Sequence, residues 1–245
     1  MATYYIKNCI AYLAKAVTWN DNFKSIARVK TDTMLQACGQ EPDYDNDSFL
    51  VISSSIISFG LQDYGANVTI FDGIHKFGEE EFTGEMYDGD LEDFIAHGRK
   101  FDWVIAPEEW LTWAETEEDQ IHKLSIISKI TRKGFFTTLK DYKNMYANQR
   151  YFEEPFVLRS NTGDSVIIRR REWDNQDRQS WNHLNYIICG EDLFICPVTR
   201  RRTMYFKQIA KFSSDLGATQ FSVEKDTMYK PVFSKSFEYV ICISF

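Results

Sequence analysis

Three short apolar runs, separated by segments long enough to form helices, most constrain how this chain can fold. They are residues 49–55 (FLVISSS), 67–73 (NVTIFDG) and 101–107 (FDWVIAP). Runs of this length and composition are typical of strands that are buried on both faces. Strands that alternate with helices are joined by crossover connections, and such connections produce a parallel sheet. The pattern therefore predicts an α/β fold.

The second half of the chain continues this alternation. A helix is expected over residues 116–131, because acidic residues fill its first turn, and the strand GFFTTL follows it. Another helix is expected over residues 203–217, where a glycine ends it. Two β-rich stretches follow, at residues 219–226 and 237–245. The link between them is rich in turn residues, so these two strands are expected to pair antiparallel.

Composition excludes several classes of protein. The chain has 245 residues, of which 44% are apolar, and this suits one globular domain with a real core. We find no apolar run long enough to cross a membrane and no signal peptide. The five cysteines are widely spread without a C-x-x-C pair, which indicates neither a disulfide framework nor a metal site. A cytoplasmic protein with reduced thiols is the plain expectation.

The order of these elements resembles that of the class I S-adenosylmethionine-dependent methyltransferases. YGANVTIFDG is similar to the family's second strand, KFDWVIAPEEWL to its fourth strand, and residues 207–245 to its final helix and strand pair. The resemblance implies a Rossmann-like methyltransferase fold, whose mostly parallel seven-stranded sheet has an antiparallel last strand. S-adenosylmethionine is the implied cofactor. Residues 1–48 would form a helical cap, and residues 49–245 would form the methyltransferase domain.

The resemblance also assigns a set of cofactor-binding residues. Three serines stand where the family has a G-x-G-x-G pattern. Serine resists backbone conformations that glycine tolerates, so either this loop takes another shape or the cofactor site is lost. An acid at the tip of the second strand would bind the ribose, although it could instead open a turn. A later acid and its apolar neighbour would contact the adenine, although Asp88 is a close rival and a solvated loop is equally compatible. These residues are Ser53, Ser54, Ser55, Asp72, Gly73, Asp90 and Leu91.

The loop after the predicted fourth strand is where the family orients its methyl acceptor. Glu108 could accept a proton or a hydrogen bond from the acceptor, and Trp110 could contact it. The alternative for Glu108 is a surface acid that opens the next helix. Glu108 is the one catalytic candidate.

Residues 150–202 are longer than a simple crossover needs and predict a small antiparallel β addition before the last helix. It carries two arginine triplets with aromatic residues between them, a mixture typical of single-stranded nucleic-acid binding. One alternative is a solvated or salt-bridged face, because alternate side chains of a strand point outward and nearby acids can pair with them. Another is that the triplets bind an anionic small molecule or a protein partner. For His183, a structural role competes with that of a general base. The substrate-binding candidates are Trp110, Arg169, Arg171, Trp181, His183, Arg200 and Arg202.

The leading hypothesis is a methyltransferase whose acceptor is a small molecule or a nucleic acid. One alternative is a catalytically inactive binding or assembly protein with the same fold, for example from a virus. Another is a nucleic-acid-binding module that uses the arginine triplets. The leading hypothesis requires the serine-bearing and aspartate-bearing tips to lie on neighbouring parallel strands.

Overall fold

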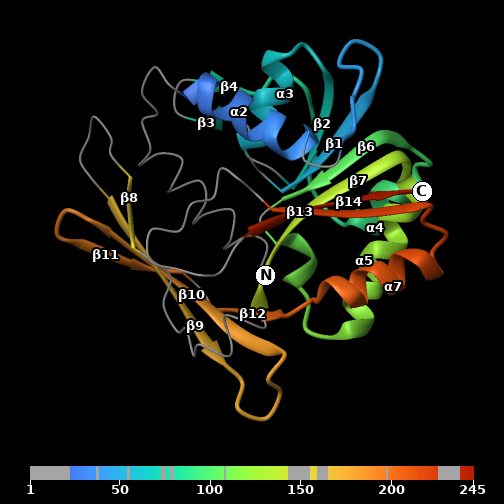
Figure 1. The fold of residues 1–245 in the computed structure, drawn as a ribbon. Coiled ribbons are helices and arrows are strands. Elements are labelled where there is room, and N and C mark those ends of the chain that lie inside the picture. The colour runs from blue at the N-terminus through green and yellow to red at the C-terminus, as the bar shows by residue number, and fades with distance from the viewer. Residues whose placement is uncertain are drawn as a thin grey trace.

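Seven strands form the central sheet of the protein in its computed structural model (Figure 1). The structure describes residues 23–36, 39–53, 56–72, 76–77, 80–107, 109–142, 155–158, 165–196, 198–225 and 238–245. The strands are β1 (Ser48–Ile52), β2 (Asn67–Phe71), β5 (Glu85–Tyr87), β6 (Phe101–Ala106), β7 (Thr131–Lys140), β13 (Gln220–Lys225) and β14 (Glu238–Ser244). Their order across the sheet is β13-β14-β7-β6-β1-β2-β5. Strands β5, β2, β1, β6 and β7 are parallel, and β14 lies antiparallel to both β7 and β13. The predicted fold class is therefore confirmed, including the antiparallel last strand.

Helices cover both faces of this sheet (Figure 1). The helices α2 (Phe23–Gln36) and α3 (Ile56–Asp63) belong to one core cluster, and α4 (Leu91–Ala96), α5 (Glu117–Ile130) and α7 (Phe206–Asp215) belong to the other. Successive residues of β1 alternate between the clusters: Phe49 and Val51 pack with α2 and α3, whereas Leu50 and Ile52 pack with α4, α5 and α7. This is the period of two expected for a strand that is buried on both faces.

The pairing of α2 with α3 depends on a glycine. A Cβ atom at Gly60 would lie 2.2 Å from Thr31 Oγ1 and 2.6 Å from the Ala27 carbonyl oxygen. The backbones of the two helices can therefore approach only because position 60 has no side chain. Of the predicted helical cap, the structure describes α2 and residues 39–48, whereas residues 1–22, 37 and 38 lie outside the described residues.

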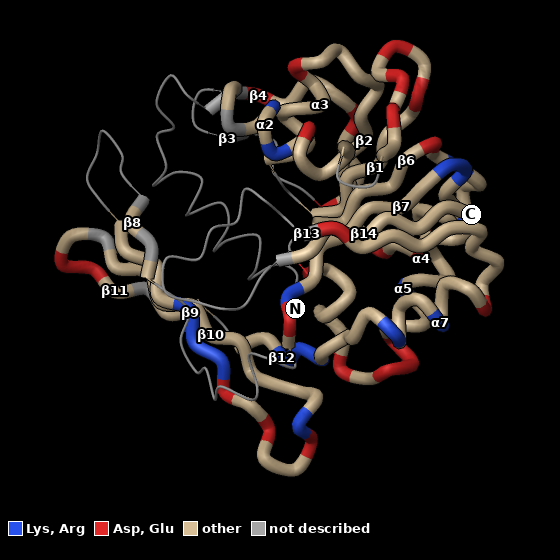
Figure 2. Tube along the Cα trace, in the orientation of Figure 1, with Lys and Arg blue, Asp and Glu red and all other residues tan. Residues whose placement is uncertain are grey.

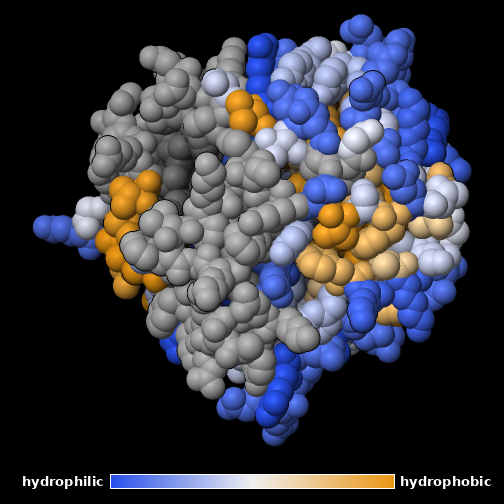
Figure 3. Space-filling view, viewed as in Figure 1, coloured by the Kyte–Doolittle hydropathy of each residue, from blue (hydrophilic) through white to orange (hydrophobic). Residues whose placement is uncertain are grey.

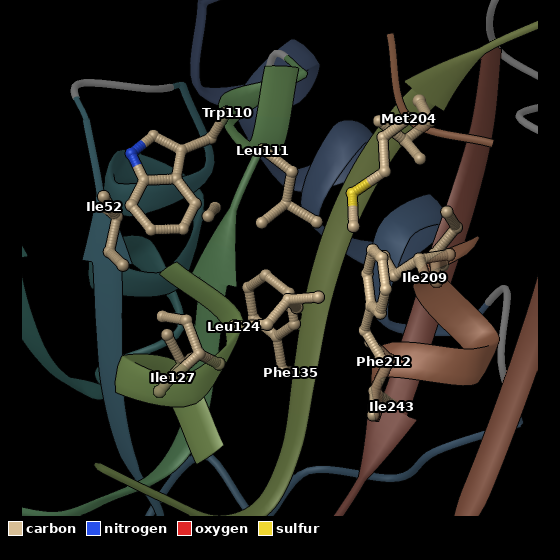
Figure 4. Close-up of a cluster of buried hydrophobic side chains, with 14 of the residues drawn as sticks. Ile52, Trp110, Leu111, Leu124, Ile127, Phe135, Met204, Ile209, Phe212 and Ile243 are labelled. Atoms are coloured by element: carbon tan, nitrogen blue, oxygen red, sulfur yellow. The ribbon is translucent and has the colours of Figure 1, made fainter. Parts of the chain in front are cut away.

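The core on the other face is closed by α5 and α7. Figure 4 shows Leu124 and Ile127 of α5 and Ile209 and Phe212 of α7 pointing toward Phe135 of β7. Helix α5 begins with a capping box, in which the Thr116 hydroxyl accepts from Asp119 N and the Asp119 carboxylate accepts from Thr116 N. The predicted helix over residues 116–131 is thus confirmed. No helix among the described residues is long and apolar enough to cross a membrane.

A second, antiparallel sheet precedes α7 in the chain and lies beside the α/β layers (Figure 1). Its strands are β8 (Phe156–Leu158), β9 (Ser165–Trp173), β10 (Ser180–Cys189), β11 (Asp192–Ile195) and β12 (Thr199–Arg202). Strand β10 pairs with β9 on one side and with β11 and β12 on the other. This sheet falls within residues 150–202, where the sequence predicted it. Val157, Leu193, Ile195 and Val198 are exposed, and Figure 3 shows apolar surface over β8 and β11.

Candidate active site

The predicted serine-bearing and aspartate-bearing tips lie on neighbouring parallel strands. Ser53 directly follows β1 and Asp72 directly follows β2, and the last residues of these strands, Ile52 and Phe71, are paired. Ser53 N donates to the Phe71 carbonyl oxygen at 2.8 Å, and Asp72 N donates to the Tyr87 carbonyl oxygen at 2.8 Å. The backbone therefore fixes both tips at the carboxyl edge of the sheet, and the required adjacency is confirmed.

Both tips adopt a backbone conformation that glycine usually supplies. The φ angle is 65° at Ser53 and 56° at Asp72, and the third described non-glycine residue with positive φ is Glu109, at 61°. Such a conformation costs a residue with a side chain about 1–2 kcal/mol. All three residues lie beyond the carboxyl ends of parallel strands that are neighbours in the sheet, where ligands of open α/β sheets usually bind. Strain of this kind is concentrated at functional sites.

The remaining predicted cofactor residues lie partly within the described chain. Asp90 is the N-cap of α4, and its Oδ1 accepts from Glu92 N at 2.7 Å. Leu91 begins that helix and packs against the core. Ser54, Ser55 and Gly73 lie outside the described residues.

A buried carboxylate lies beyond the carboxyl end of β6. The catalytic candidate Glu108 lies outside the described residues, but the next residue, Glu109, is only 6% exposed. Lys140 Nζ lies 2.6 Å from Glu109 Oε1, and the Tyr142 hydroxyl donates to Oε2. Glu109 N also donates to Thr138 Oγ1 at 3.3 Å, so this residue is tied to β7 through side chain and backbone.

Glu109 remains ionised despite its burial. Burial alone raises the pKa of a carboxyl group, but the positive charges of Lys140, Arg171 and Arg201 outweigh that effect and hold the pKa of Glu109 well below its ordinary value. Burial and the adjacent Glu109 charge raise the pKa of Tyr142 well above its ordinary value. At neutral pH the pair is therefore a carboxylate that accepts a hydrogen bond from a neutral phenol.

One face of the antiparallel sheet meets this carboxylate, and we name it the inward face. It carries the odd-numbered residues of β9 and β12 and their partners on β10, because paired residues of antiparallel strands lie on the same face. The Trp181 ring lies 5.1 Å from the Tyr142 ring, and the Arg201 guanidinium lies 4.7 Å from the centre of the Trp113 ring. Gln120 of α5 anchors the end of β12, since its Nε2 donates to the Arg202 carbonyl oxygen at 3.1 Å.

The substrate-binding candidates divide between the two faces of this sheet. The inward face carries four of them, Arg169, Arg171, Trp181 and His183. Arg171, Trp181 and His183 are buried, and the charges of Arg169, Arg171 and Arg201 all act on His183. Arg171, Trp181 and His183 are therefore brought together around Glu109 and Tyr142, and Arg169 lies on the same face.

The outward face carries the other arginines, and each pairs with a carboxylate. Arg200 lies 2.8 Å from Asp174, Arg202 lies 2.6 Å from Asp177, and Arg170 lies 2.7 Å from Glu172. Figure 2 shows these opposite charges next to one another along β9 and around the turn to β10. Two of the candidates, Arg200 and Arg202, thus stabilise the β9–β10 turn and lie away from Glu109.

Trp110, the remaining candidate, is part of the core. It is 8% exposed and begins a short 3₁₀ helix, η1 (Trp110–Thr112), and Figure 4 shows its ring beside Ile52. The Lys123 ammonium lies 4.6 Å from the centre of this ring and donates to the carbonyl oxygens of Trp110 and Trp113. Burial lowers the pKa of Lys123 to about 7, although the charge of Asp119 opposes this effect.

Sequence reasoning missed Glu109, Lys140, Tyr142 and Arg201. A charged residue at the end of a buried strand, as Lys140 is, signals a buried partner, because an unpaired charge is rarely tolerated there. Arg201 lies within one of the arginine triplets. Because successive side chains of a strand point to opposite faces, Arg201 faces the other way from Arg200 and Arg202. Among the described residues, no group of three or more His, Cys, Asp or Glu side chains could hold a metal ion.

No protein-family model and no curated protein matches the chain. Solved structures do match it. The CcbJ methyltransferase from Streptomyces caelestis aligns with a TM-score of 0.59 at 12% identity, over 91% of this chain and 89% of that chain. An S-adenosylmethionine-dependent methyltransferase from Clostridium acetobutylicum aligns with a TM-score of 0.57 at 12% identity, over 96% and 98%.

A third match is CalS10 with bound S-adenosylmethionine. It is an amino pentose methyltransferase from Micromonospora echinaspora that takes part in calicheamicin biosynthesis. It aligns with a TM-score of 0.55 at 10% identity, over 95% of this chain and 94% of that chain. Together with the strand order, these similarities show that the chain has the fold of the S-adenosylmethionine-dependent methyltransferases.

Proposed function

We propose that this protein is an S-adenosylmethionine-dependent methyltransferase that acts on a small-molecule acceptor. The observation that carries the proposal is the adjacency of Ser53 and Asp72 at the carboxyl ends of β1 and β2. In open α/β sheets this edge is the usual place for a nucleotide-like ligand.

The donor and acceptor chemistry of the two tips fits this cofactor. A carboxylate accepts hydrogen bonds only, so Asp72 suits the two hydroxyl groups of a ribose. Ser53 carries a hydroxyl that can donate to the carboxylate of the methionine part, and its positive φ gives the backbone a conformation that glycine would otherwise provide. When bound, the cofactor supplies an electrophilic methyl group on a sulfonium.

The acceptor would bind between Glu109 and the inward face of the antiparallel sheet. Methyl transfer depends mainly on holding the attacking atom in line with the methyl carbon, so positioning residues matter more than a chemical catalyst. Glu109 holds Lys140 and Tyr142 in place, and Glu108 remains the predicted proton acceptor. The outward arginines are paired with carboxylates, which favours a small molecule over a nucleic acid.

Titration calorimetry with S-adenosylmethionine tests the proposal. We expect saturable binding, and we expect Asp72→Ala to raise the dissociation constant at least about tenfold, which corresponds to the loss of hydrogen bonds to a charged group. Asp93→Asn, an exposed acid on α4, is the matched control and should change the constant less than about twofold. An absence of binding at millimolar cofactor by the folded wild-type protein would refute the proposal.

A further inference from the structure

Several buried polar atoms on and opposite the inward face have no hydrogen-bond partner within the described part of the chain. They include Trp181 Nε1, His183 Nδ1 and Arg201 Nε on the inward face, and Trp113 Nε1 on the loop after η1. Trp181 is 1% exposed and His183 is 6% exposed. A buried polar atom without a partner costs about 1–3 kcal/mol, and native proteins keep few of them. Their grouping therefore requires an explanation.

These atoms belong to one cluster. Trp181 and Arg201 are paired across β10 and β12, so their side chains are direct neighbours on the inward face. Arg201 lies over the Trp113 ring at 4.7 Å, which brings the second indole to the same place. His183 is two residues from Trp181 on the same face, and the charge of Arg201 acts on it directly.

Arg201 is the charged member of the cluster. Burial lowers its pKa to about 10, so the guanidinium stays positive at neutral pH. It contacts an indole face, but no described carboxylate lies within ion-pair distance of it, unlike Arg200 and Arg202 on the same strand. The charge of Glu109 offsets part of the cost of burying Arg201, but that carboxylate is in direct contact with Lys140 and Tyr142. An anion in direct contact would stabilise the Arg201 guanidinium further, and a guanidinium is suited to planar carboxylates and to phosphates.

The neighbours of Arg201 are suited to donate to such an anion. The two indole nitrogens can only donate hydrogen bonds. Burial, followed by the charges of Arg201, Arg171 and Arg169, lowers the pKa of His183 to about 2, so its ring is neutral and one nitrogen can donate. Donors grouped around one cation match the oxygens of an anionic group.

We infer that the inward face binds an anionic group of the methyl acceptor, a carboxylate or a phosphate, through Arg201, Trp113, Trp181 and His183. That the bound anion belongs to the methyl acceptor rests on the proposed function. The existence of the anion site does not depend on that function. Arg201 is then a specificity-determining residue of the acceptor site.

Indole N–H signals provide a direct test by NMR of the full-length ¹⁵N-labelled protein. Inorganic phosphate and acetate are titrated separately, with glycerol as the neutral control. We expect the Trp113 and Trp181 signals, assigned with the Trp113→Phe and Trp181→Phe variants, to shift saturably with at least one anion below about 10 mM. Saturation by phosphate alone identifies a phosphate group, and saturation by acetate alone identifies a carboxylate. If neither anion shifts these two signals, the inference is overturned.

Two variants on the same strand sharpen the test. Arg201→Gln should weaken the anion at least about tenfold, because a charge-assisted hydrogen bond is lost. Arg200→Gln is the matched control, on the outward face, and should leave the anion affinity within about twofold. Equal affinity of the wild type and Arg201→Gln would contradict the inference. Calorimetry with S-adenosylmethionine separates the two ideas, since anion binding without cofactor binding refutes only the proposed function, and the reverse refutes only the inference.

Discussion

The central sheet and the antiparallel sheet bury different kinds of side chain. The central sheet buries apolar side chains on both faces, and its polar features are confined to the strand tips, as at Ser53 and Asp72. The inward face of the antiparallel sheet buries arginine, histidine and tryptophan around Glu109. The first arrangement gathers apolar side chains on both faces of parallel strands, whereas the second gathers charged and aromatic side chains around one carboxylate. Buried charge is therefore concentrated where the antiparallel sheet meets Glu109.

The largest expected effect comes from removing the buried charge at the junction of the two sheets. Glu109→Gln removes the carboxylate charge that pairs with Lys140, and breaking a buried pair in this way costs about 3–5 kcal/mol of unfolding free energy. Urea denaturation followed by circular dichroism measures the loss. Glu172→Gln, which removes an exposed pair with Arg170, is the control and should cost less than about 1 kcal/mol. Equal losses of unfolding free energy in the two variants would contradict the view that the buried charge at Glu109 contributes more to stability than the exposed pair.

A substitution in the α/β layers tests packing instead of charge. Gly60→Ala places a methyl group against Thr31 Oγ1 and the Ala27 carbonyl oxygen, so α2 must move away from α3 at a cost of about 1–3 kcal/mol. The same denaturation assay applies. Ser214→Ala, at an exposed position of α7, should stay within about 0.5 kcal/mol of the wild type. A neutral Gly60→Ala would contradict the close approach of the two helices.

The central sheet could be predicted because its signals are local. Strands β1, β2 and β6 are short apolar runs in the sequence. The start of α5 is indicated by the N-cap residue Thr116 and the acidic residues that follow it. The adjacency of Ser53 and Asp72 followed from the order of the elements. The positive φ of Ser53 did not, because serine is a poor predictor of that conformation.

The surroundings of Glu109 could be predicted only in part, because they depend on which residues of each strand face inward and on how the strands pair. Glu108 and Glu109 are consecutive, and nothing in the hydropathy pattern indicates the turn that buries Glu109. The alternation of the arginine triplet is plain from the sequence. Which member faces inward depends on the pairing of Trp181 with Arg201, and that pairing is a long-range contact.

A smaller, pH-dependent effect is expected at the inward face. The pKa of His183 is about 2 in the folded protein, against an ordinary value near 6.5, because of burial and the neighbouring arginines. As the pH falls through 6.5, His183 binds a proton in the unfolded chain but not in the folded chain. The free energy of unfolding therefore decreases. Between pH 6.5 and 5.5 this group should remove about 1 kcal/mol of unfolding free energy. The stability present above pH 6.5 is thus lost on acidification.

His183→Gln should abolish this part of the pH dependence, as measured by denaturation at a series of pH values. His97→Gln, an exposed histidine at the end of α4, provides the comparison and should keep the wild-type slope. If both variants keep that slope, the neutral histidine is not the cause.

The smallest expected effect concerns the tip of β1. Ser53→Gly removes the steric penalty of a positive φ but increases the freedom of the unfolded chain, so the net gain is about 0.5 kcal/mol. Ser53→Ala keeps the penalty and should give no gain. Precise thermal denaturation of the three proteins distinguishes them, and a stabilising alanine would argue against strain at this tip.

Strand β12 has only four residues, and its alternation assigns opposite tasks to consecutive arginines. Adding or deleting one residue before it would turn Arg200 and Arg202 toward Glu109 and Arg201 toward the solvent. The same composition would then present two guanidiniums inside and would release the turn that they now hold. A change in chain length can therefore alter which charges this scaffold buries, without any amino-acid replacement.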